Sequence, residues 1–558
     1  MPMPPPRDAH PDHGLFNAMR PTRLPSASPA LLIAALAVLP FLGKAFTIDD
    51  PIFLKEAEHV LVDPLHPTAF EYPWNQEPER VSAIVPTGPV GAWILVPAVL
   101  AGGSEPVAHL ITLAFLWLAI LATVSLGLQL GLGRAGATAA GLLLATAPAV
   151  LAMAGTAMPD VAAMALGVAG LDRLVAWNRD RRLLAALLAA ILLGLAPLAR
   201  THLLLLLPLG ALLLVDEPLS LDSWRGRPRS RWLPLAGAAA LVWGGTVLTR
   251  DPGGTAGTIQ GAVVSLSGLD NLPFNTVVFH VHWVMTTTLG LAWAILRWRA
   301  LLSRWWLLVV GTAGAAFLLR LGHGTREHQS MAPLAGLGLA VLADVVVDAW
   351  QRRDRLQAVL WLWLLLPLPA VIYVHFPAKY LLASAPAAAL LVARRLKDVG
   401  RGAAWSVLGL SAVLGTLLGV AMLRADSNFG DAGREAAATL IAPRVASGEH
   451  VWFLGHWGFQ WYAERAGGRF FSVSPPYPVP GDIVVSSRES SPQFDILDLH
   501  DRSMIVPLAR VELGEPGGRI MSRKGGAGFY SNTWGYLPWT WSEEPIESYF
   551  VWRLVKTR

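Results

Sequence analysis

Apolar segments close to the length of a membrane crossing recur along most of the chain. A helix needs about 20 consecutive apolar residues to cross the hydrocarbon layer. Thirteen runs approach this length, at residues 27–46, 106–129, 136–155, 160–177, 183–199, 202–215, 232–249, 276–296, 305–321, 331–349, 356–375, 380–394 and 403–423. The pattern predicts a polytopic α-helical membrane protein with about 13 transmembrane helices.

One further apolar stretch, residues 88–103, is short for a crossing and contains Pro89 and Pro97. We interpret it as re-entrant or interfacial. The arginines support this interpretation, because cytoplasmic flanks are enriched in Lys and Arg. With the stretch left out, basic clusters fall on the cytoplasmic side at Arg20/Arg23, 173–182, 225–231, 297–304, 352–355 and 394–401. The loop 47–87, the turns near Asp160, Arg200, Arg326 and Lys379, and everything after Arg424 then lie on the outer side.

The composition becomes mixed polar after about residue 425. A helix-like run at 430–445 is followed by strand-like runs at 450–454, 482–486, 504–508 and 549–554. This pattern predicts a small α/β domain outside the cytoplasm. We therefore divide the chain into a flexible cytoplasmic tail at 1–26, a transmembrane domain at 27–425 with a large first outer loop at 47–105, and a soluble α/β domain at 426–558.

Composition narrows the class of protein. Hydrophobic residues make up 54% and charged residues 15% of the 558 positions, whereas a soluble domain carries roughly 25% charged residues. The net charge of +5 does not indicate nucleic-acid binding, because the arginines stand in short clusters between apolar runs. The absence of cysteine excludes disulfides, thiolate metal sites and cysteine nucleophiles.

Two adjacent carboxylates, Asp49 and Asp50, stand where the first apolar run ends, before Pro51. A carboxylate at the edge of hydrocarbon loses hydration, so we expect its pKa to rise and the group to accept a proton from a hydroxyl. Equally, an Asp before Pro starts a helix well. Asp160, after Pro159 at another outer turn, has the same two interpretations.

Cationic residues occupy three further outer turns. Arg200 lies with His202 in the first, and Lys379 lies with His375 and Tyr380 in another. The remaining turn holds Arg320, His323, Arg326 and His328. A charge this close to lipid is paired or functional, and such donors would stabilise a phosphate leaving group. For Arg250 and Arg424 we favour simple snorkelling to the interface.

Two other groups of residues carry weaker signals. His280 and His282 have a spacing that suits metal binding on a strand, but on a helix residues two apart diverge. The aromatic residues Trp534, Tyr536, Trp539 and Trp541 suit stacking on a sugar ring, an interfacial belt or core packing, and the sequence leaves these three open.

Taken together, these motifs resemble the GT-C membrane glycosyltransferases, in particular the aminoarabinose-lipid A transferases and the dolichyl-phosphate-mannose protein mannosyltransferases. The first helix ends in an acidic pair, a long outer loop contains a re-entrant Pro-rich stretch, and a Pro-Asp pair marks the next outer turn. The segment Pro377 to Pro386 is similar to the family's basic-Tyr-x-Leu-Pro-x-x-Pro motif. The resemblance covers nearly the whole chain.

The resemblance implies an inverting transfer of a sugar from a polyprenyl-phosphate donor to a lipid, glycan or protein acceptor. Asp49 would be the catalytic base, with Asp50 beside it and Asp160 completing the acidic site. The donor phosphate would meet Lys379, Arg200, Arg326 and Tyr380. No metal or other cofactor is expected. The chain departs from the family in having Pro86-Thr-Gly-Pro89 where His-Pro-Pro or Lys-Pro-Pro is common, and Asp-Asp where many relatives have Asp-Glu.

The implied setting is the inner membrane of a bacterium, with a multi-pass monomer, membrane lipids as partners and the C-terminal domain in the periplasm. The rival interpretations are a secondary transporter or lipid flippase, and a scaffold without catalytic activity. Transporters place ionisable residues near the midplane and show matching halves. Here the charges gather toward one face and no halves match, which favours the enzyme.

Overall fold

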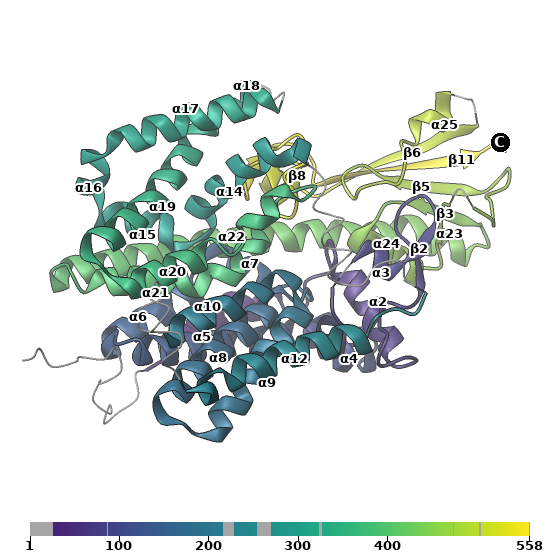
Figure 1. The fold of residues 1–558 in the computed structure, drawn as a ribbon. Coiled ribbons are helices and arrows are strands. Elements are labelled where there is room, and N and C mark those ends of the chain that lie inside the picture. The colour runs from purple at the N-terminus through teal and green to yellow at the C-terminus, as the bar shows by residue number, and fades with distance from the viewer. Residues whose placement is uncertain are drawn as a thin grey trace, which may run out of the picture.

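The computed structural model describes residues 26–85, 87–215, 228–253, 269–322, 326–472, 474–501 and 504–556. A helical bundle forms one part, and a smaller part that contains most of the strands lies at one end of it, on the right in Figure 1. The predicted tail at 1–26 lies outside the described residues except for Ser26. The chain is thus a polytopic helical membrane protein with a strand-containing C-terminal domain.

Most of the bundle consists of α-helices joined by short turns. Its helices are α1 Ser28–Val38, α2 Asp50–Val60, α3 Val81–Ile84, α4 Val90–Leu100, α5 Glu105–Gln129, α6 Gly133–Ala145, α7 Pro148–Ala154, α8 Asp160–Asp180, α9 Leu183–Ala199, α10 Leu206–Leu214, α12 Leu233–Leu248, α14 Leu272–Thr286, α15 Thr288–Leu296, α16 Trp298–Ser303, α17 Trp305–Leu321, α18 Arg326–Gln329, α19 Ala332–Arg352, α20 Arg355–Leu364, α21 Ala385–Leu396 and α22 Arg401–Ala436. In the outer loop, β1 (Glu71–Pro73) pairs with β2 (Pro78–Arg80).

Each of the thirteen predicted apolar runs falls on helical structure, but few of them form one long helix. Among the described residues, four helices are long and apolar enough to cross a membrane, or up to six if each bent pair is one span. Five shorter apolar helices of 10–17 residues accompany them. The structure therefore does not establish thirteen complete crossings.

Two predicted crossings are broken by sharp bends. The run 136–155 divides into α6 and α7, which meet at 58°. Ala147 is extended there because the ring of Pro148 disfavours helical backbone in the residue before it. The run 276–296 divides into α14 and α15, bent by 74° at Thr287, whose hydroxyl accepts a hydrogen bond from the N–H of Leu289.

The apolar stretch 88–103 forms α4, which has 11 residues and contains Pro97. Eleven residues span about 16 Å as a helix, which is about half of the hydrocarbon thickness. The helix packs against α2 of the outer loop and against α5 and α9. Its short length agrees with the prediction that this stretch does not cross the membrane.

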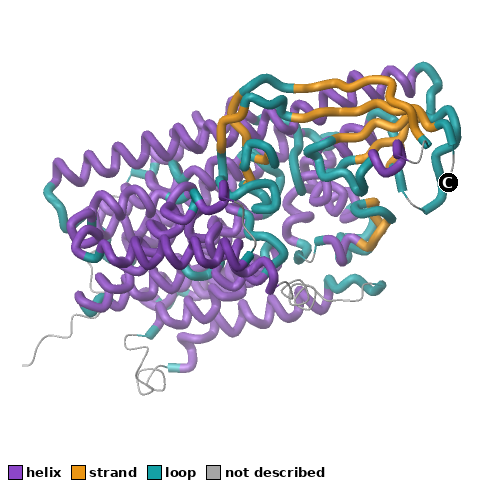
Figure 2. Tube along the Cα trace, turned by 90° about the horizontal axis from the view of Figure 1, so that it is seen from above, coloured by secondary structure: helices purple, strands orange, loops and turns teal. Residues whose placement is uncertain are grey.

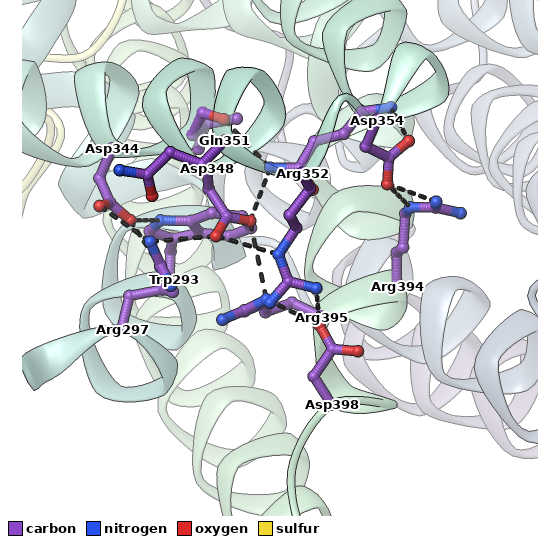
Figure 3. A network of polar contacts seen from close by, with 12 residues as sticks. Trp293, Arg297, Asp344, Asp348, Gln351, Arg352, Asp354, Arg394, Arg395 and Asp398 are labelled. Atoms are coloured by element: carbon purple, nitrogen blue, oxygen red, sulfur yellow. Dashed lines mark hydrogen bonds and ion pairs between the residues drawn. The ribbon is translucent and has the colours of Figure 1, made fainter. Parts of the chain in front are cut away.

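A network of ion pairs lies at the end of the bundle that is remote from the sheet (Figure 1 and Figure 3). Asp344 and Asp348, both buried on α19, are its centre. Asp344 accepts hydrogen bonds from Trp293 Nε1 at 3.0 Å and Arg297 Nε at 2.8 Å, and Asp348 lies 3.2 Å from Arg352 Nε. Three of the predicted cytoplasmic clusters, 297–304, 352–355 and 394–401, contribute to this network.

The C-terminal domain is built on a five-stranded mixed sheet with the order β4-β3-β5-β11-β6 (Figure 2). Its strands are β3 Val451–Leu454, β4 Arg469–Phe470, β5 Ile483–Ser487, β6 Ile505–Leu513 and β11 Glu547–Leu554. Helix α24 (Trp457–Arg465) connects the parallel neighbours β3 and β4. All four predicted strand-like runs are confirmed.

Smaller elements complete the domain: the π-helical turn η7 Ala437–Ile441, α23 Ala442–Ala446, α25 Leu497–Asp501, β7 Gly517–Arg519, β8 Met521–Ser522, β9 Ala527–Gly528 and β10 Thr540–Ser542.

The predicted boundary at 425/426 lies inside α22, which is one continuous helix of 36 residues. At 1.5 Å per residue this helix is about 54 Å long. It runs along the bundle and continues to the C-terminal domain (Figure 1). The run 430–445 is therefore the extension of a bundle helix through η7 and α23, and this continuous backbone fixes the domain relative to the bundle.

The segment between α1 and α2 is held where the bundle meets the C-terminal domain. A Cβ on Gly458 of α24 would lie 1.9 Å from Phe46 O, and one on Gly430 of α22 would lie 2.7 Å from Ala45 O. The two glycines thus allow both helices to approach the backbone of this segment. Below it, Lys44 Nζ lies 2.8 Å from Asp426 Oδ2 of α22, and both side chains are fully buried.

We expect Lys44→Met to destabilise the protein by about 3–5 kcal/mol, because Asp426 would remain buried without a counter-charge. Denaturant unfolding of the detergent-solubilised protein would measure the loss. Lys55→Met is the matched control, since Lys55 is a partly exposed partner of Glu58 and its loss should cost less than about 1 kcal/mol. The double variant Lys44→Met/Asp426→Leu should regain most of the loss. Equal stability of the two single variants would refute the assignment.

Candidate active site

A cavity of about 560 Å³ lies where the bundle, the outer loop and the C-terminal domain meet. Its lining includes four of the predicted site residues, Asp49, Arg200, Lys379 and Tyr380. These residues come from parts of the chain that are far apart in sequence. The structure thus brings these four residues together in one cavity, while their roles stay a prediction.

Asp49 takes the N-cap position of α2, but its side chain does not cap the helix. Its Oδ2 instead accepts a hydrogen bond from Lys379 Nζ at 2.6 Å. The residue before it, Ile48, has a φ of 46°, which is a strained conformation for a β-branched residue. Of the two interpretations that the sequence left open for Asp49, capping by the side chain is thus excluded.

The pKa of Asp49 contradicts the expectation that this carboxyl has a raised pKa. Burial does raise it, but the ammonium of Lys379 and its hydrogen bond lower it, and Arg200 and His375 lower it further. The net pKa lies below the usual value for Asp. Asp49 is therefore a carboxylate whose charge is balanced by Lys379.

Asp50 is fully buried and is not among the residues that line the cavity. Its carboxyl accepts hydrogen bonds from the N–H groups of Thr47 at 3.0 Å and Ala157 at 2.8 Å. Burial raises its pKa to about 7, although Lys44 and these N–H groups act in the opposite direction. Through these two hydrogen bonds, Asp50 links the turn that contains Asp49 to the segment before α8.

Arg200 and Asp160 form a second buried ion pair, with Nη2 and Oδ2 at 2.6 Å. Asp160 is the first residue of α8, and Arg200 follows α9 in an extended conformation. The guanidinium of Arg200 lies 5.2 Å from the ring centre of Phe53 of α2. Arg200 lines the cavity whereas Asp160 does not, so Asp160 orients the guanidinium from behind.

The segment that carries Lys379 is clamped between α14 and the C-terminal domain. Asn275 Nδ2 donates to the carbonyls of Val371 and Tyr373 at 2.9 and 2.7 Å. Asn532 Oδ1 accepts from the N–H of Phe376, and Asn532 Nδ2 donates to Asn275 Oδ1 at 2.8 Å. The clamp holds the backbone that precedes Lys379 in place.

Two aromatic residues of this segment, Tyr373 and Tyr380, also line the cavity. The ring of Tyr380 packs 5.6 Å from that of His202, and its hydroxyl has no hydrogen-bond partner among the described residues. Arg326 begins α18, but its side chain lies outside the described part of the chain. Its predicted contact with the phosphate therefore stays a prediction.

Several cavity residues were missed by the sequence analysis because no local pattern marks them. Trp74 comes from the outer loop, and His456, Trp457 and Ser491 come from the C-terminal domain. Trp457 and Ser491 have φ values of 63° and 47°. Together with Ile48, three of the five non-glycine residues with positive φ in the described chain line this cavity, and such strain gathers at functional sites.

The other sequence signals resolve in different ways. His280 and His282 lie within α14, as the helical interpretation required. Within the described residues there is no group of three or more His, Cys, Asp or Glu side chains that would hold a metal, and the expectation of no metal stays a prediction. Of the aromatic run, Trp534 lines the cavity, Tyr536 stacks 5.6 Å from Phe274, and Trp541 is exposed.

A buried acid that the sequence analysis missed, Glu56, lies behind the site on α2. Its side chain is fully buried, and neither carboxyl oxygen has a hydrogen-bond partner in the described structure. Burial raises its pKa to about 8, partly offset by the charge of Arg200. Glu56 is therefore protonated at neutral pH.

This raised pKa predicts a pH dependence of stability. The folded protein keeps the Glu56 proton up to about pH 8, whereas the unfolded chain releases it near the ordinary pKa of about 4.3. Stability from this group is thus complete below the unfolded pKa and falls as the pH rises toward 8. Glu56→Gln should remove this fall, so that thermal midpoints of the variant exceed those of wild type increasingly from pH 5 to 8. Glu58→Gln, at a partly exposed position, should run parallel to wild type, and a parallel Glu56→Gln curve would contradict the raised pKa.

Comparison with known proteins gives matches in fold. No protein-family model matches the chain, and no curated protein matches it. Among solved structures it is similar to the oligosaccharyltransferase of Archaeoglobus fulgidus, with 14% identity, a TM-score of 0.44, and 82% of this chain and 68% of that chain covered. It is also similar to ArnT from Cupriavidus metallidurans bound to undecaprenyl phosphate (14%, 0.42, 86% and 95%) and to the arabinofuranosyltransferase AftD from Mycobacteria (13%, 0.41, 96% and 40%).

Proposed function

We propose that the protein is an inverting glycosyltransferase that moves a sugar from a polyprenyl-phosphate carrier to an acceptor hydroxyl. The reaction takes place at the outer face of a bacterial inner membrane, with the C-terminal domain in the periplasm. One observation carries the proposal: a carboxylate, Asp49, is paired at 2.6 Å with a cation, Lys379, inside a cavity between membrane helices and an outer domain.

The cavity lining contains both kinds of residue that a lipid-linked donor needs. Lys379 and Arg200 present positive charge, and the hydroxyl of Tyr380 adds a hydrogen-bond donor. These three residues therefore suit a phosphate group. Apolar residues continue the lining: Ile84, Val85, Leu205, Pro369 and Ala370. These apolar residues suit the first isoprene units of the carrier, whose remaining length would lie in the membrane.

In the proposed reaction the acceptor oxygen attacks the anomeric carbon as the bond from this carbon to the phosphate oxygen breaks. The acceptor hydroxyl transfers its proton to the Asp49 carboxylate. The electron pair of the broken bond stays on the phosphate, whose increasing negative charge is stabilised by Lys379 and Arg200. The attack occurs opposite the leaving group, so the configuration at the anomeric carbon inverts.

In the proposed reaction, donor binding changes the partner of Lys379, which pairs with Asp49 in the structure. A phosphate competes with Asp49 for the ammonium of Lys379, because both are anions that need the same donor. When the ammonium moves to the phosphate, its lowering effect on the Asp49 pKa weakens while burial still raises that pKa. Donor binding thus converts a neutralised carboxylate into a stronger base.

Two predicted catalytic residues take supporting roles in this proposal. Asp50 holds the backbone of the Asp49 turn, and Asp160 holds Arg200. Both are buried outside the cavity lining, so they position the groups that meet the substrates. Arg326 is kept as a further phosphate ligand of the carrier, on the basis of the sequence alone.

We expect Asp49→Asn to lower the rate of transfer by about 10²–10⁴-fold, because the amide cannot accept the acceptor proton. Transfer of sugar from a polyprenyl-phosphate donor by the purified protein in nanodiscs would be measured. Asp63→Asn is the control, because Asp63 lies in the same outer loop and is 41% exposed. Wild-type activity in Asp49→Asn would remove this residue from catalysis.

We expect Lys379→Met to weaken retention of the carrier, since it removes the cation nearest to Asp49 and keeps much of the side-chain volume. Native mass spectrometry of the purified protein would compare bound polyprenyl phosphate, co-purified or added, in wild type, Lys379→Met and the control Lys55→Met. A loss of about tenfold or more in Lys379→Met alone is expected for one charge-assisted contact. Carrier binding that is equal in all three proteins would place the phosphate elsewhere.

A further inference from the structure

One part of the cavity lining contains aromatic rings and uncharged polar groups. We call it the outer wall and define it by Trp74, Asn75, His456, Trp457, Ser491, Ser531, Thr533 and Trp534. These residues come from the first outer loop and the C-terminal domain. Among the cavity-lining residues of the described structure, the charged ones are Asp49, Arg200 and Lys379, and none of these three belongs to the C-terminal domain.

The aromatic part of the outer wall is rigidly held. Trp74 stacks on the imidazole of His456 with ring centres 4.9 Å apart and planes at 21°. Trp457 and Trp534 pack against each other with ring centres 5.2 Å apart. The guanidinium of Arg523 lies 4.6 Å from the ring centre of Trp534. Rings fixed in this way offer apolar surface without losing much conformational freedom when a ligand binds.

The polar part of the outer wall provides groups that a ligand can hydrogen-bond. His456 Nδ1 lies 3.2 Å from Gln493 Nε2 and 3.4 Å from Gln460 Oε1, and its Nε2 has no partner in the described structure. Burial lowers the pKa of His456 to about 4, so the ring is neutral at physiological pH. Ser491 also lines the cavity, and its hydroxyl makes no hydrogen bond to another described residue.

Buried contacts hold Ser491 and Trp534 in their positions. The backbone of the neighbouring Ser490 accepts a hydrogen bond from the N–H of His456 at 2.7 Å. The carboxyl of Glu547 accepts hydrogen bonds from Ser490 Oγ and from the N–H groups of Arg488 and Glu489. The carboxyl of Glu489 in turn accepts from the N–H of Arg523, the residue that packs on Trp534. These hydrogen bonds thus fix the positions of Ser491 and Trp534 in the outer wall.

We propose that the outer wall is the acceptor subsite and that the acceptor is a neutral saccharide. The C–H face of a pyranose is apolar and packs on an aromatic ring, while its hydroxyl groups lie at the rim and hydrogen-bond to side chains such as Ser491, Asn75 and His456. An anionic acceptor would need cations that this wall lacks in the described structure. The inference rests on the proposed function, because the acceptor hydroxyl must reach Asp49 across the same cavity.

The subsite is tested by saturation-transfer NMR with the full-length protein in nanodiscs, since maltoside detergents carry a sugar themselves. The probes are the methyl glycosides of glucose, mannose, galactose and arabinose, with glucose 1-phosphate and a blocked Ser- and Thr-containing peptide as competitors of other classes. The variants are Trp534→Ala, Ser491→Ala and Trp541→Ala. Trp541 is the matched control, because it lies in the same domain, is 63% exposed and does not line the cavity.

At least one neutral glycoside should bind to wild type and to Trp541→Ala, and its signal should fall about fivefold or more in Trp534→Ala. Ser491→Ala, which removes one hydroxyl without a partner and is not expected to unfold the domain, should weaken the signal as well. Unchanged signals in both variants, absence of any glycoside signal in wild type, or preferential binding of the phosphate or the peptide would each overturn the proposal.

Carrier binding is measured in the same variants by native mass spectrometry. Retained polyprenyl phosphate and its sugar conjugate in Trp534→Ala would confirm that the outer wall serves the acceptor. Loss of the sugar conjugate alone would assign this wall to the donor sugar and overturn the proposal. If glycosides bind through Trp534 while wild type binds no polyprenyl phosphate, the proposed function fails and the saccharide site stands.

Discussion

The short segment from Lys44 to Asp50 is the part of the chain on which the site depends. It leaves the first helix, passes between α22 and α24, and is fixed by the buried pair of Lys44 with Asp426 and by the bonds of Asp50 to two backbone N–H groups. Because these contacts hold the segment in place, Ile48 can adopt a strained φ of 46°. The Asp49 carboxyl is therefore directed into the cavity by the packing of two domains.

This arrangement explains why the cavity tolerates so many ionisable groups near a membrane. Both Lys379 and Arg200, which line the cavity, form an ion pair with a carboxylate. Lys379 pairs with Asp49, and Arg200 pairs with Asp160. Removing a charge from water is costly unless a counter-charge lies close. These four charges thus balance one another, and in the proposed reaction a donor phosphate would add negative charge where both cations already have defined positions.

Much of this could be predicted from the sequence, because the signals were local. The outer turns at Asp49, Arg200 and Lys379 each follow an apolar run, and the placement of basic clusters was enough to assign them to one face. Breaks within apolar runs were not predictable in the same way, since Thr287 gives no signal comparable to Pro148. The change to a mixed polar composition after about residue 425 suggested a domain boundary, although a helix backbone continues through charged positions without cost when they are paired or exposed.

The residues that were not predictable share one cause. Trp74, His456, Trp457 and Ser491 become neighbours of Asp49 only through the docking of the C-terminal domain on the outer loop, and a local pattern contains no information about such a contact. The same limit applies to the adjacent pair Asp49 and Asp50, which sequence alone treats as equivalent.

The lowered pKa of Asp49 is the opposite of what burial alone would give, and it has a consequence for the order of events. In the proposed reaction, an Asp49 carboxylate that is paired with Lys379 would not readily activate water. In that reaction Asp49 would become a stronger base once a phosphate has bound Lys379. The lipid-linked donor would then occupy the space beside Asp49. Under the proposed function, the pairing of Asp49 with Lys379 would thus link proton acceptance to donor binding and would protect an activated sugar from hydrolysis without a separate gate.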